Sequence, residues 1–236
     1  MMATNFTSIL QDSLCGKSSF TKADLVKALS NYSDNPKTIA WRIHDLKEKG
    51  IIHNVGRGIY TWNTKTQYVP DISERSKTLY KSIHDRFPYA NFCITETKWF
   101  NEFMRHQVFK SYRVIEIEKE VTSILFNNLK ETGEEAFLNP DAQMYNTYIS
   151  AVENPVIVKP LITESPLQLA EQIRVPTIEK MLVDLISDKE LYSAQETEVD
   201  GIFKAATEKY HINSNKLMRY AGRRNKENKL HNYYQF

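Results

Sequence analysis

Residues 35–62 combine a helix-forming pattern with side chains that can contact the phosphates and base edges of a nucleic acid. Lysine and arginine pair with phosphate oxygens, threonine donates or accepts hydrogen bonds, and tryptophan offers a flat apolar surface. An exposed helix face that carries such groups can read a duplex, because an α-helix fits into the major groove. The candidate contact residues are Lys37, Thr38, Trp41, Arg42, Lys49 and Arg57.

The apolar residues of this stretch predict a helix over residues 36–49. Pro36 suits the first helical position, where its missing N–H would have no partner. Gly50 suits the position after the helix, because glycine easily adopts the left-handed backbone that often ends one. Four apolar residues recur at the spacing that lines one side of a helix. They are Ile39, Ala40, Ile43 and Leu46.

The opposite side of this helix carries the candidate contact residues. Successive side chains turn by about 100°, so Trp41 and Asp45 lie opposite Ile43. Arg42 and Lys49 flank them. A tryptophan that points into solvent indicates a binding partner. The remaining residues near this face are Lys37, Thr38, His44 and Glu48.

Two short β-prone runs, "IIHN" and "GIYTW", follow the helix. Gly56 and Gly58 give the backbone freedom for a tight hairpin with Arg57 at its tip. An isolated hairpin is unstable in water, so this one must pack on the preceding helices. Residues 1–67 are therefore predicted to form a winged helix-turn-helix. Its third helix would enter the major groove, and its wing would reach an adjacent backbone or minor groove.

Two further helices are expected before residue 36. The first spans "NFTSILQDSL", and the second spans residues 21–30. Thr21 can cap the second helix, and Asp24 lies near the positive end of its dipole. The predicted apolar face consists of Leu25, Val26 and Leu29. The alternative to a DNA-binding domain is a three-helix adaptor that binds another protein.

The charge of the chain is unevenly distributed, although the net charge of its 236 residues is only +2. Residues 1–67 hold nine Lys or Arg against five Asp or Glu, which gives +4. Residues 209–236 hold seven against one, which gives +6, so the middle of the chain carries −8. A polyanionic partner is therefore expected at the ends.

Composition predicts an ordinary globular protein, with 41% hydrophobic and 25% charged residues. No apolar run approaches the roughly 20 residues of a membrane span, and the N-terminal residues lack a signal-peptide pattern. Cys15 and Cys93 are too few for a disulfide framework and do not form a metal-ligand pair. We therefore expect a cytoplasmic protein that contacts no membrane.

Residues 63–73 lack periodicity and contain Pro70, which is typical of a linker. The remaining residues, 74–236, alternate between strand-like and helix-like segments. This alternation predicts a mixed α/β (α+β) domain with helices covering a sheet. Strands are expected in "YANFCITET", "YRVIEIEK", "EAFLN" and "NPVIVKPL". Helices are expected in "ERSKTLYKSIHDRF", "KWFNEFM", "EVTSILFNNLKE", "PTIEKMLVDLISD", "ETEVDGIFKAATEKYH" and "NSNKLMRYAGRRNKENKLHNYY".

The common catalytic and cofactor patterns are not found in the sequence. The seven glycines are too scattered for a phosphate-binding loop, the six histidines never fall at metal-ligand spacing, and no nucleophile elbow is present. One alternative remains open. Asp85, Glu96 and Lys98 resemble the two carboxylates and the lysine of a Mg²⁺-dependent nuclease. We expect no cofactor, no metal and no catalytic residue.

Two charged segments near the C-terminus allow a structural and a functional interpretation. Glu196, Glu198 and Asp200 could bind a metal, but they more simply suit the start of a helix. The tail interleaves basic and aromatic residues, which can bind nucleic acid or an acidic protein, or remain solvated while apolar neighbours pack. Its candidate surface residues are Arg219, Arg223, Arg224 and Lys226.

Four segments carry a resemblance to a known family. They are "KEKGIIHNVGRGIYTW", "ITETKWFNEFM", "VPTIEKMLVDLISD" and "INSNKLMRYAGRRNK". With them the chain resembles the AbiEi antitoxin-like family, bacterial proteins encoded beside a nucleotidyltransferase-like toxin. The resemblance implies that the N-terminal winged helix binds operator DNA and represses its own operon, while the C-terminal domain counters the toxin.

The resemblance implies that Lys37, Arg42, Lys49 and Arg57 contact DNA. The acidic residues Asp45 and Glu48 lie on the same face, so this face is not uniformly basic. The resemblance carries over no catalytic residue. The sequence therefore predicts a DNA-binding, autoregulating antitoxin of a type IV toxin-antitoxin system without enzymatic activity. The alternatives are a Mg²⁺-dependent nuclease or nucleotidyl-transfer enzyme guided by the winged helix, and a regulator whose C-terminal domain senses a ligand.

Overall fold

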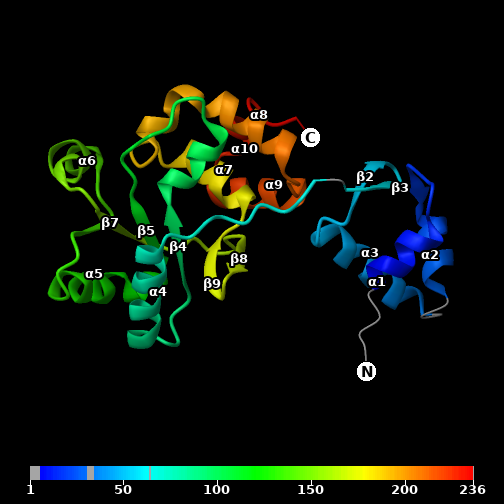
Figure 1. The fold of residues 1–236 in the computed structure, drawn as a ribbon, viewed down its shortest axis with the longest axis horizontal. Helices are drawn as coiled ribbons and strands as arrows, with labels where there is room; N and C mark the ends of the chain where they lie inside the picture. Colours follow the sequence, from blue (N-terminus) through cyan, green and yellow to red (C-terminus); the bar gives the residue numbers. More distant parts are fainter. Residues whose placement is uncertain (1–5, 31–34, 64, 236) are drawn as a thin grey trace. The chain divides into compact units, whose positions relative to one another are not determined.

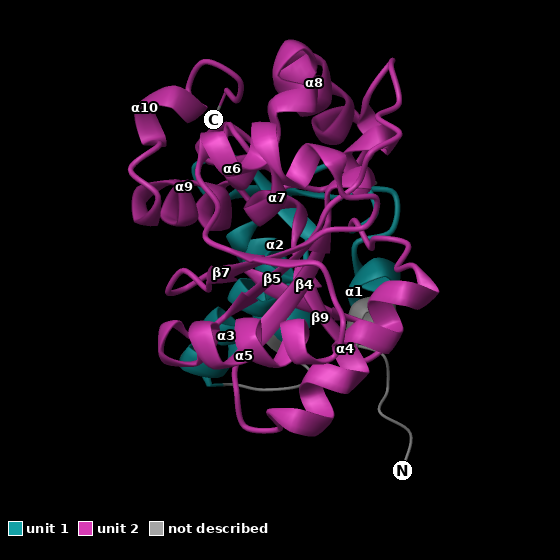
Figure 2. Cartoon of the chain, turned by 90° about the vertical axis from the view of Figure 1, so that its left-hand side faces the viewer, with its two compact units in different colours: residues 1–67 teal, residues 68–236 magenta. Residues whose placement is uncertain are grey.

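The structure is a computed structural model that describes residues 6–30, 35–63 and 65–235 (Figure 1). The chain divides into two compact units, residues 1–67 and residues 68–236, which Figure 2 shows in different colours. Each unit has a hydrophobic core of its own. Among the helices in these described ranges, none has the length and apolar composition needed to cross a bilayer.

The first unit consists of three helices and three short strands. In chain order they are α1 (Phe6–Ser13), β1 (Phe20–Thr21), α2 (Lys22–Ser30), α3 (Pro36–Glu48), β2 (Ile52–Gly56) and β3 (Ile59–Trp62). The sequence predicted the three helices and the hairpin but not β1, which is only two residues long. The strands form an antiparallel sheet in the order β1-β3-β2.

The core of the first unit is built from one side of each helix and from the sheet. Its buried residues are Leu10, Leu14, Phe20, Leu25, Ala28, Leu29, Ile39, Ile43, Leu46, Ile52 and Tyr60. Two predicted core positions are wrong. Val26 is 38% exposed and Ala40 is also exposed. Both lie at the edge of an apolar stripe, where a residue's burial depends on how far the neighbouring element reaches.

The second unit is a mixed α/β domain, as predicted. Its strands are β4 (Phe92–Glu96), β5 (Arg113–Ile117), β6 (Ala136–Leu138), β7 (Val156–Pro160), β8 (Leu167–Ala170) and β9 (Ile173–Pro176). Its α-helices are α4 (Glu74–Arg86), α5 (Thr122–Glu131), α6 (Ala142–Thr147), α7 (Ile178–Ser187), α8 (Val199–Lys209), α9 (Ser214–Arg223) and α10 (Glu227–Leu230). Short 3₁₀ helices are η1 (Thr97–Phe103), η2 (Lys119–Val121), η3 (Ile149–Ala151) and η4 (Ser193–Glu198).

Four of these strands form one sheet in the order β4-β5-β7-β6. Strand β4 is antiparallel to β5, whereas β5, β7 and β6 are parallel to one another. Strands β8 and β9 form an antiparallel hairpin whose strand β9 lies beside β4. Helices α4 and α5 cover one face of the sheet, and α7 with α8–α10 covers the other (Figure 2).

Most elements expected in the second unit are confirmed, with three differences. The segment "KWFNEFM" forms the 3₁₀ helix η1 and not an α-helix. Its buried Phe100 and Phe103 are spaced by three residues, which is the period of a 3₁₀ helix. The short helix α6 and the β8–β9 hairpin were not predicted. The hairpin lies in "PLQLAEQIRV", where Glu171 and Gln172 form the turn and both have a positive φ. Glycine is the residue that usually marks such a turn in a sequence, and this turn has none.

Candidate nucleic-acid interface and interior ion-pair network

Both ends of α3 are fixed by hydrogen bonds. At its N-terminus the side chain of Asn35 accepts a hydrogen bond from the backbone N–H of Lys37 at 3.0 Å. At its C-terminus Gly50 has a φ of 64°, and the N–H of Ile51 donates to the carbonyl of Leu46 at 2.9 Å. Only a residue that tolerates the left-handed backbone fits that position well. The helix therefore presents its outer face in a fixed orientation within the unit.

The outer face of α3 is exposed where the periodicity predicted it. Ile39, Ile43 and Leu46 are buried, and Trp41 on the opposite side is 63% exposed. Lys37 is exposed, whereas Thr38 and Arg42 are half-buried at the edges of the face. The side chain of Trp41 thus has a large apolar surface in contact with solvent.

The charge of the α3 face is lower than a count of its lysines suggests. Nζ of Lys49 lies 2.7 Å from Oδ2 of Asp45, one turn earlier in the helix. Because this pair is exposed, it adds little stability. It nevertheless neutralises one of the predicted phosphate contacts in the free protein. The face of α3 therefore carries both positive and negative charges and is not uniformly basic.

The hairpin presents Arg57 at its turn. In the antiparallel pairing of β2 with β3, Ile52 lies opposite Trp62 and Gly56 lies opposite Ile59. The register shifts between Asn54 and Gly56. Gly58 has a φ of 73°, whereas Gly56 belongs to the strand and needs no left-handed backbone. The carbonyl of Gly58 accepts a hydrogen bond from the N–H of Lys22 at 2.9 Å, which ties the turn to β1 and α2. Arg57 itself is exposed.

The four tail cations do not form one surface. Arg224 belongs to the interior: its side chain is 12% exposed, and its Nη2 lies 2.7 Å from Oδ1 of Asp188. Arg223 forms an ion pair with Glu164. Arg219 is exposed and Lys226 is half-buried. The prediction of a shared surface is wrong for Arg224, because its guanidinium turns inward toward buried carboxylates.

The nuclease-like residues do not converge. Glu96 is buried, and its carboxylate accepts hydrogen bonds from the N–H and hydroxyl of Ser73, both at 2.9 Å. Lys98 pairs with the same carboxylate at 3.1 Å. Asp85 lies twelve residues after Ser73 on α4, which is about 18 Å along a helix axis. Glu96 therefore anchors the start of α4, and Asp85 lies near the other end of that helix.

The acidic segment 196–200 also has a structural role. Glu198 precedes α8, and its carboxylate accepts hydrogen bonds from the N–H groups of Arg105 at 2.7 Å and His106 at 3.1 Å. These hydrogen bonds lower the pKa of Glu198. Across the described residues, no three His, Cys, Asp or Glu side chains are grouped so that they could hold a metal ion.

A row of polar residues crosses the sheet on the face that α7 covers. Cys93 on β4 is paired in register with Glu116 on β5, and Glu116 with Lys159 on β7. Residues in register on neighbouring strands point to the same face of a sheet, so the three side chains form one row. Helix α7 faces this row with Lys180 and Asp184, and Asp188 follows one turn later.

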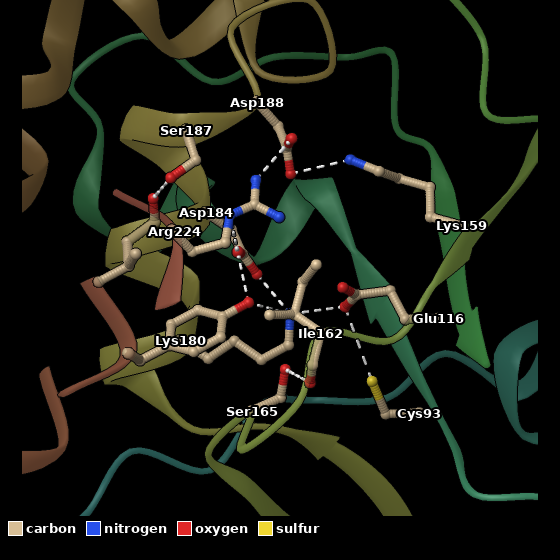
Figure 3. A network of polar contacts seen from close by, with 12 residues as sticks. Cys93, Glu116, Lys159, Ile162, Ser165, Lys180, Asp184, Ser187, Asp188 and Arg224 are labelled. Atoms are coloured by element: carbon tan, nitrogen blue, oxygen red, sulfur yellow. Dashed lines mark hydrogen bonds and ion pairs between the residues drawn. The ribbon is translucent and has the colours of Figure 1, made fainter. Parts of the chain in front are cut away.

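Lys180 lies at the centre of this ion-pair network (Figure 3). Its side chain has no exposed surface, and its Nζ lies 2.6 Å from Oε2 of Glu116. The ammonium also pairs with Asp184 and donates to the hydroxyl of Tyr220 at 3.2 Å. That hydroxyl donates in turn to Oδ1 of Asp184 at 2.9 Å. Each donor of the buried ammonium therefore has an oxygen partner.

The network continues toward the end of α7. Asp188 accepts from Arg224 on one oxygen at 2.7 Å and pairs with Lys159 on the other at 2.9 Å (Figure 3). Nε of Arg224 also lies 3.9 Å from Oδ1 of Asp184, so three carboxylates alternate with three cations. The contacts join β5, β7, α7 and the segment after α9, so the network holds the C-terminal helices on the sheet.

The environment of the network shifts the pKa values of its members. Burial raises the pKa of the Cys93 thiol, and the carboxylate of Glu116 raises it further. Burial lowers the pKa of Lys180, but Asp184 and Glu116 outweigh that effect and hold it well above its usual value. Lys159 and Arg224 likewise outweigh the effect of burial on Asp188, whose pKa is lowered. The lysine is therefore charged and the thiol neutral, so Cys93 is a poor nucleophile.

Sequence reasoning missed this network, although a signal was present. Lys180, Asp184 and Asp188 recur at intervals of four, which places them on one side of a helix that is otherwise mostly apolar. Charged residues at that spacing inside an apolar helix indicate paired buried charges. The partners Glu116 and Lys159 gave no such signal, because their alignment depends on strand register.

The fold defines a mixed α/β protein in two units, and the comparisons with known proteins place it in a family. Residues 38–236 match the model of a family described as a family of unknown function (DUF6577). This match covers most of the chain, so the protein belongs to that family. The match begins within α3 and includes the hairpin and the whole second unit. No curated protein matches the chain.

Proposed function

We propose that the protein is a DNA-binding transcriptional regulator whose first unit is a winged helix-turn-helix. In this proposal α3 enters the major groove, and the β2–β3 turn with Arg57 contacts the neighbouring backbone or minor groove. The single observation that supports it best is the outer face of α3, where Trp41 is 63% exposed beside exposed or half-buried basic residues. An apolar ring in such a position suits contact with sugars and bases.

The order of the elements also supports this proposal. Three helices precede a two-stranded hairpin, and β1 joins the hairpin to form a small sheet. The hairpin turn is tied to the second helix by the Lys22–Gly58 hydrogen bond, so the position of Arg57 relative to the helices of this unit is limited. A wing needs that restraint, because it must reach the backbone while the recognition helix occupies the groove.

The resemblance to AbiEi antitoxin-like proteins suggests what the regulator does in its operon. We propose that it represses its own promoter in the bacterial cytoplasm. We further propose that the second unit counters a nucleotidyltransferase-like toxin, by contact or by opposing its effect. This proposal assigns no catalytic step to the chain. The separation of Asp85 from Glu96 supports it over the nuclease alternative.

The experiment is a titration of the full chain against duplex DNA from upstream of its own gene. Arg57→Ala should weaken binding by about 1 kcal/mol or more, and the slope of log affinity against log salt should become shallower by about 1. Lys204→Ala on α8 is the matched control, since it removes one exposed charge from the second unit. Equal binding by the wild type, Arg57→Ala and Lys204→Ala would remove the wing from the proposal.

The antitoxin role has a separate test. The neighbouring reading frame is expressed alone and together with this protein, and growth is measured. Rescue by the wild type and by Arg57→Ala alike would mean that neutralisation of the toxin does not need the Arg57 contact with DNA. No rescue by the wild type would contradict the antitoxin role but leave the DNA-binding proposal intact.

A further inference from the structure

An open groove lies on the second unit between α4 and α5, outside the ion-pair network. Its volume is about 530 Å³. The helices that border it lie on the same side of the sheet (Figures 1 and 2). The groove is lined from α4 by Thr78, Lys81, Ser82, Asp85 and Arg86, and from α5 and its end by Asn128 and Thr132. No apolar or aromatic side chain is among these lining residues.

The spacing of these residues explains why they share a groove. On α4, residues 78, 81, 82 and 85 follow the three- and four-residue intervals that line one side of a helix. On α5, residues 128 and 132 are four apart. The opposite sides of the two helices carry Leu79, Ile83, Leu125 and Leu129, which are buried against the sheet. Packing of the apolar sides therefore leaves two polar sides next to each other.

Lys81 and Arg86 are unpaired cations within the described part of the chain. Other basic residues of α4 are engaged: Lys77 pairs with Glu74 at 3.0 Å and with Glu171 at 2.7 Å. Among the residues that the structure describes, neither Lys81 nor Arg86 belongs to an ion pair, although Asp85 lines the same groove. The second unit holds 22 basic and 24 acidic residues, so its net charge is −2. The groove, with two cations and Asp85, is locally positive on an acidic unit.

The uncharged groups of the groove add donors and acceptors. The hydroxyl of Thr78 donates to the carbonyl of Glu74 at 2.9 Å, and that of Thr132 donates to the carbonyl of Asn128 at 3.1 Å. Both threonine oxygens therefore remain acceptors toward the groove. Ser82 and the amide of Asn128 can donate. A ligand of this groove must supply anionic oxygens for the cations, and a ligand with a hydroxyl can also donate to Asp85.

We propose that the α4–α5 groove binds the sugar–phosphate backbone of a nucleic-acid strand. A pocket for a small organic ligand is mostly apolar and encloses it, whereas this groove is open and every residue that lines it is polar or charged. Arg, Lys, Ser, Thr and Asn are the side chains that contact phosphates and sugars. Lys81 and Arg86 are five residues apart, about 7.5 Å along the helix axis, so one strand can contact both through separate phosphates. In an RNA strand, a ribose 2′-hydroxyl can also donate to Asp85.

The contact proposed here is separate from that of the first unit and does not depend on it. It requires no base recognition, because no ring lines the groove on which a base could stack. It therefore adds affinity for a strand without adding sequence preference, whereas α3 would supply the preference. Its occupant is a single strand or one strand of a duplex backbone.

The test measures binding of labelled single-stranded DNA and RNA of mixed sequence to the full chain by fluorescence anisotropy over a range of salt concentrations. Lys81→Gln/Arg86→Gln should weaken binding about tenfold at low salt. The slope of log affinity against log salt should become shallower by about 1.4, which corresponds to two phosphates on a single strand. The same double substitution in the Arg57→Ala background should give the same change.

The matched control is Lys119→Gln/Lys204→Gln, which removes two exposed cations of the second unit away from the groove. The proposal is overturned if both pairs of substitutions weaken binding equally, since the effect would then be general electrostatics. It is also overturned if AMP or inorganic phosphate displaces the strand at concentrations near the strand's own Kd, since the groove would then be a small-anion site. A change confined to the Lys81/Arg86 pair supports it, even if Arg57→Ala has no effect on duplex binding.

Discussion

Nζ of Lys180 lies 2.6 Å from Oε2 of Glu116, although the lysine side chain has no exposed surface. This contact joins α7 to the middle of the sheet. The two charges compensate each other only because both are held in place, with Asp184 and Tyr220 occupying the other donors of the ammonium. A buried charge without its partner is costly, whereas a buried pair replaced by apolar groups often is not.

Lys180→Met should therefore destabilise the second unit by about 3–5 kcal/mol, since it leaves Glu116 and Asp184 buried without a cation. The measurement is urea unfolding, with amide exchange in α7 to report on this unit. Lys189→Met is the control, because that lysine is exposed and 4.0 Å from Glu196, and it should cost less than about 0.5 kcal/mol. Combining Lys180→Met with Glu116→Gln and Asp184→Asn should recover part of the loss. If it recovers none, the cost arises from packing and not from charge.

Because the Cys93 thiol ionises less readily in the folded state than in the unfolded chain, the folded state should lose stability in mild alkali. Burial and Glu116 raise the pKa of the Cys93 thiol in the folded state. In the unfolded chain the thiol has its ordinary pKa of about 8.5, so it ionises at a lower pH there than in the fold. The stabilisation is complete below that pH and is lost as the pH rises toward the folded pKa, by up to about 1.4 kcal/mol per pH unit. Between about pH 8.5 and 9.5, Cys93→Ala should show a shallower loss than the wild type in urea unfolding under reducing conditions. Cys15→Ala, at an exposed cysteine, should keep the wild-type slope. Identical slopes for all three proteins would contradict the assignment.

The elements that sequence predicted well are those set by local pattern. Helix α3 is fixed by Pro36, an apolar period and Gly50, all of which are visible within 15 residues. The β8–β9 hairpin was missed because its turn at Glu171 and Gln172 has positive φ without glycine. The expectation of an α-helix over "KWFNEFM" was wrong, because a three-residue and a four-residue period are hard to tell apart over seven residues.

For the candidate contact residues too, the sequence predicted the features that follow from local pattern and missed those that depend on residues far along the chain. The exposure of Trp41 follows from helix periodicity, and so could be predicted. The inward turn of Arg224 depends on Asp188, 36 residues earlier, and no local pattern indicates that pairing. The Cys93–Glu116–Lys159 row likewise depends on strand order, which the sequence left open. Charges that look like a surface in the sequence can therefore belong to the interior.

Substitution of Trp41 should weaken DNA binding without changing the stability of the fold. Because its side chain is 63% exposed, Trp41→Ala should change the free energy of unfolding by less than about 0.5 kcal/mol. If α3 enters the groove, the same substitution should weaken duplex binding at least fivefold, about 1 kcal/mol. Iodide quenching gives an independent measurement, since saturating duplex should protect the fluorescence of the wild type. Unchanged quenching would show that the ring stays in solvent and that α3 is not the contact helix.

Asp45 should reduce DNA affinity in the wild type, because it holds the ammonium of Lys49 at 2.7 Å and places a carboxylate on the α3 face. Asp45→Asn removes that charge and keeps the size of the side chain, so Lys49 becomes available to a phosphate. Duplex affinity should rise by about three- to tenfold at low salt, and the dependence of log affinity on log salt should steepen by about 1, the contribution of one more phosphate contact. The stability of the unit should hardly change, since an exposed i,i+4 pair contributes only about 0.3–0.5 kcal/mol. Asp12→Asn is the control: it removes an equal exposed charge from α1. If both substitutions raise affinity equally, the unit attracts DNA through its net charge, and the face of α3 has no special part in it.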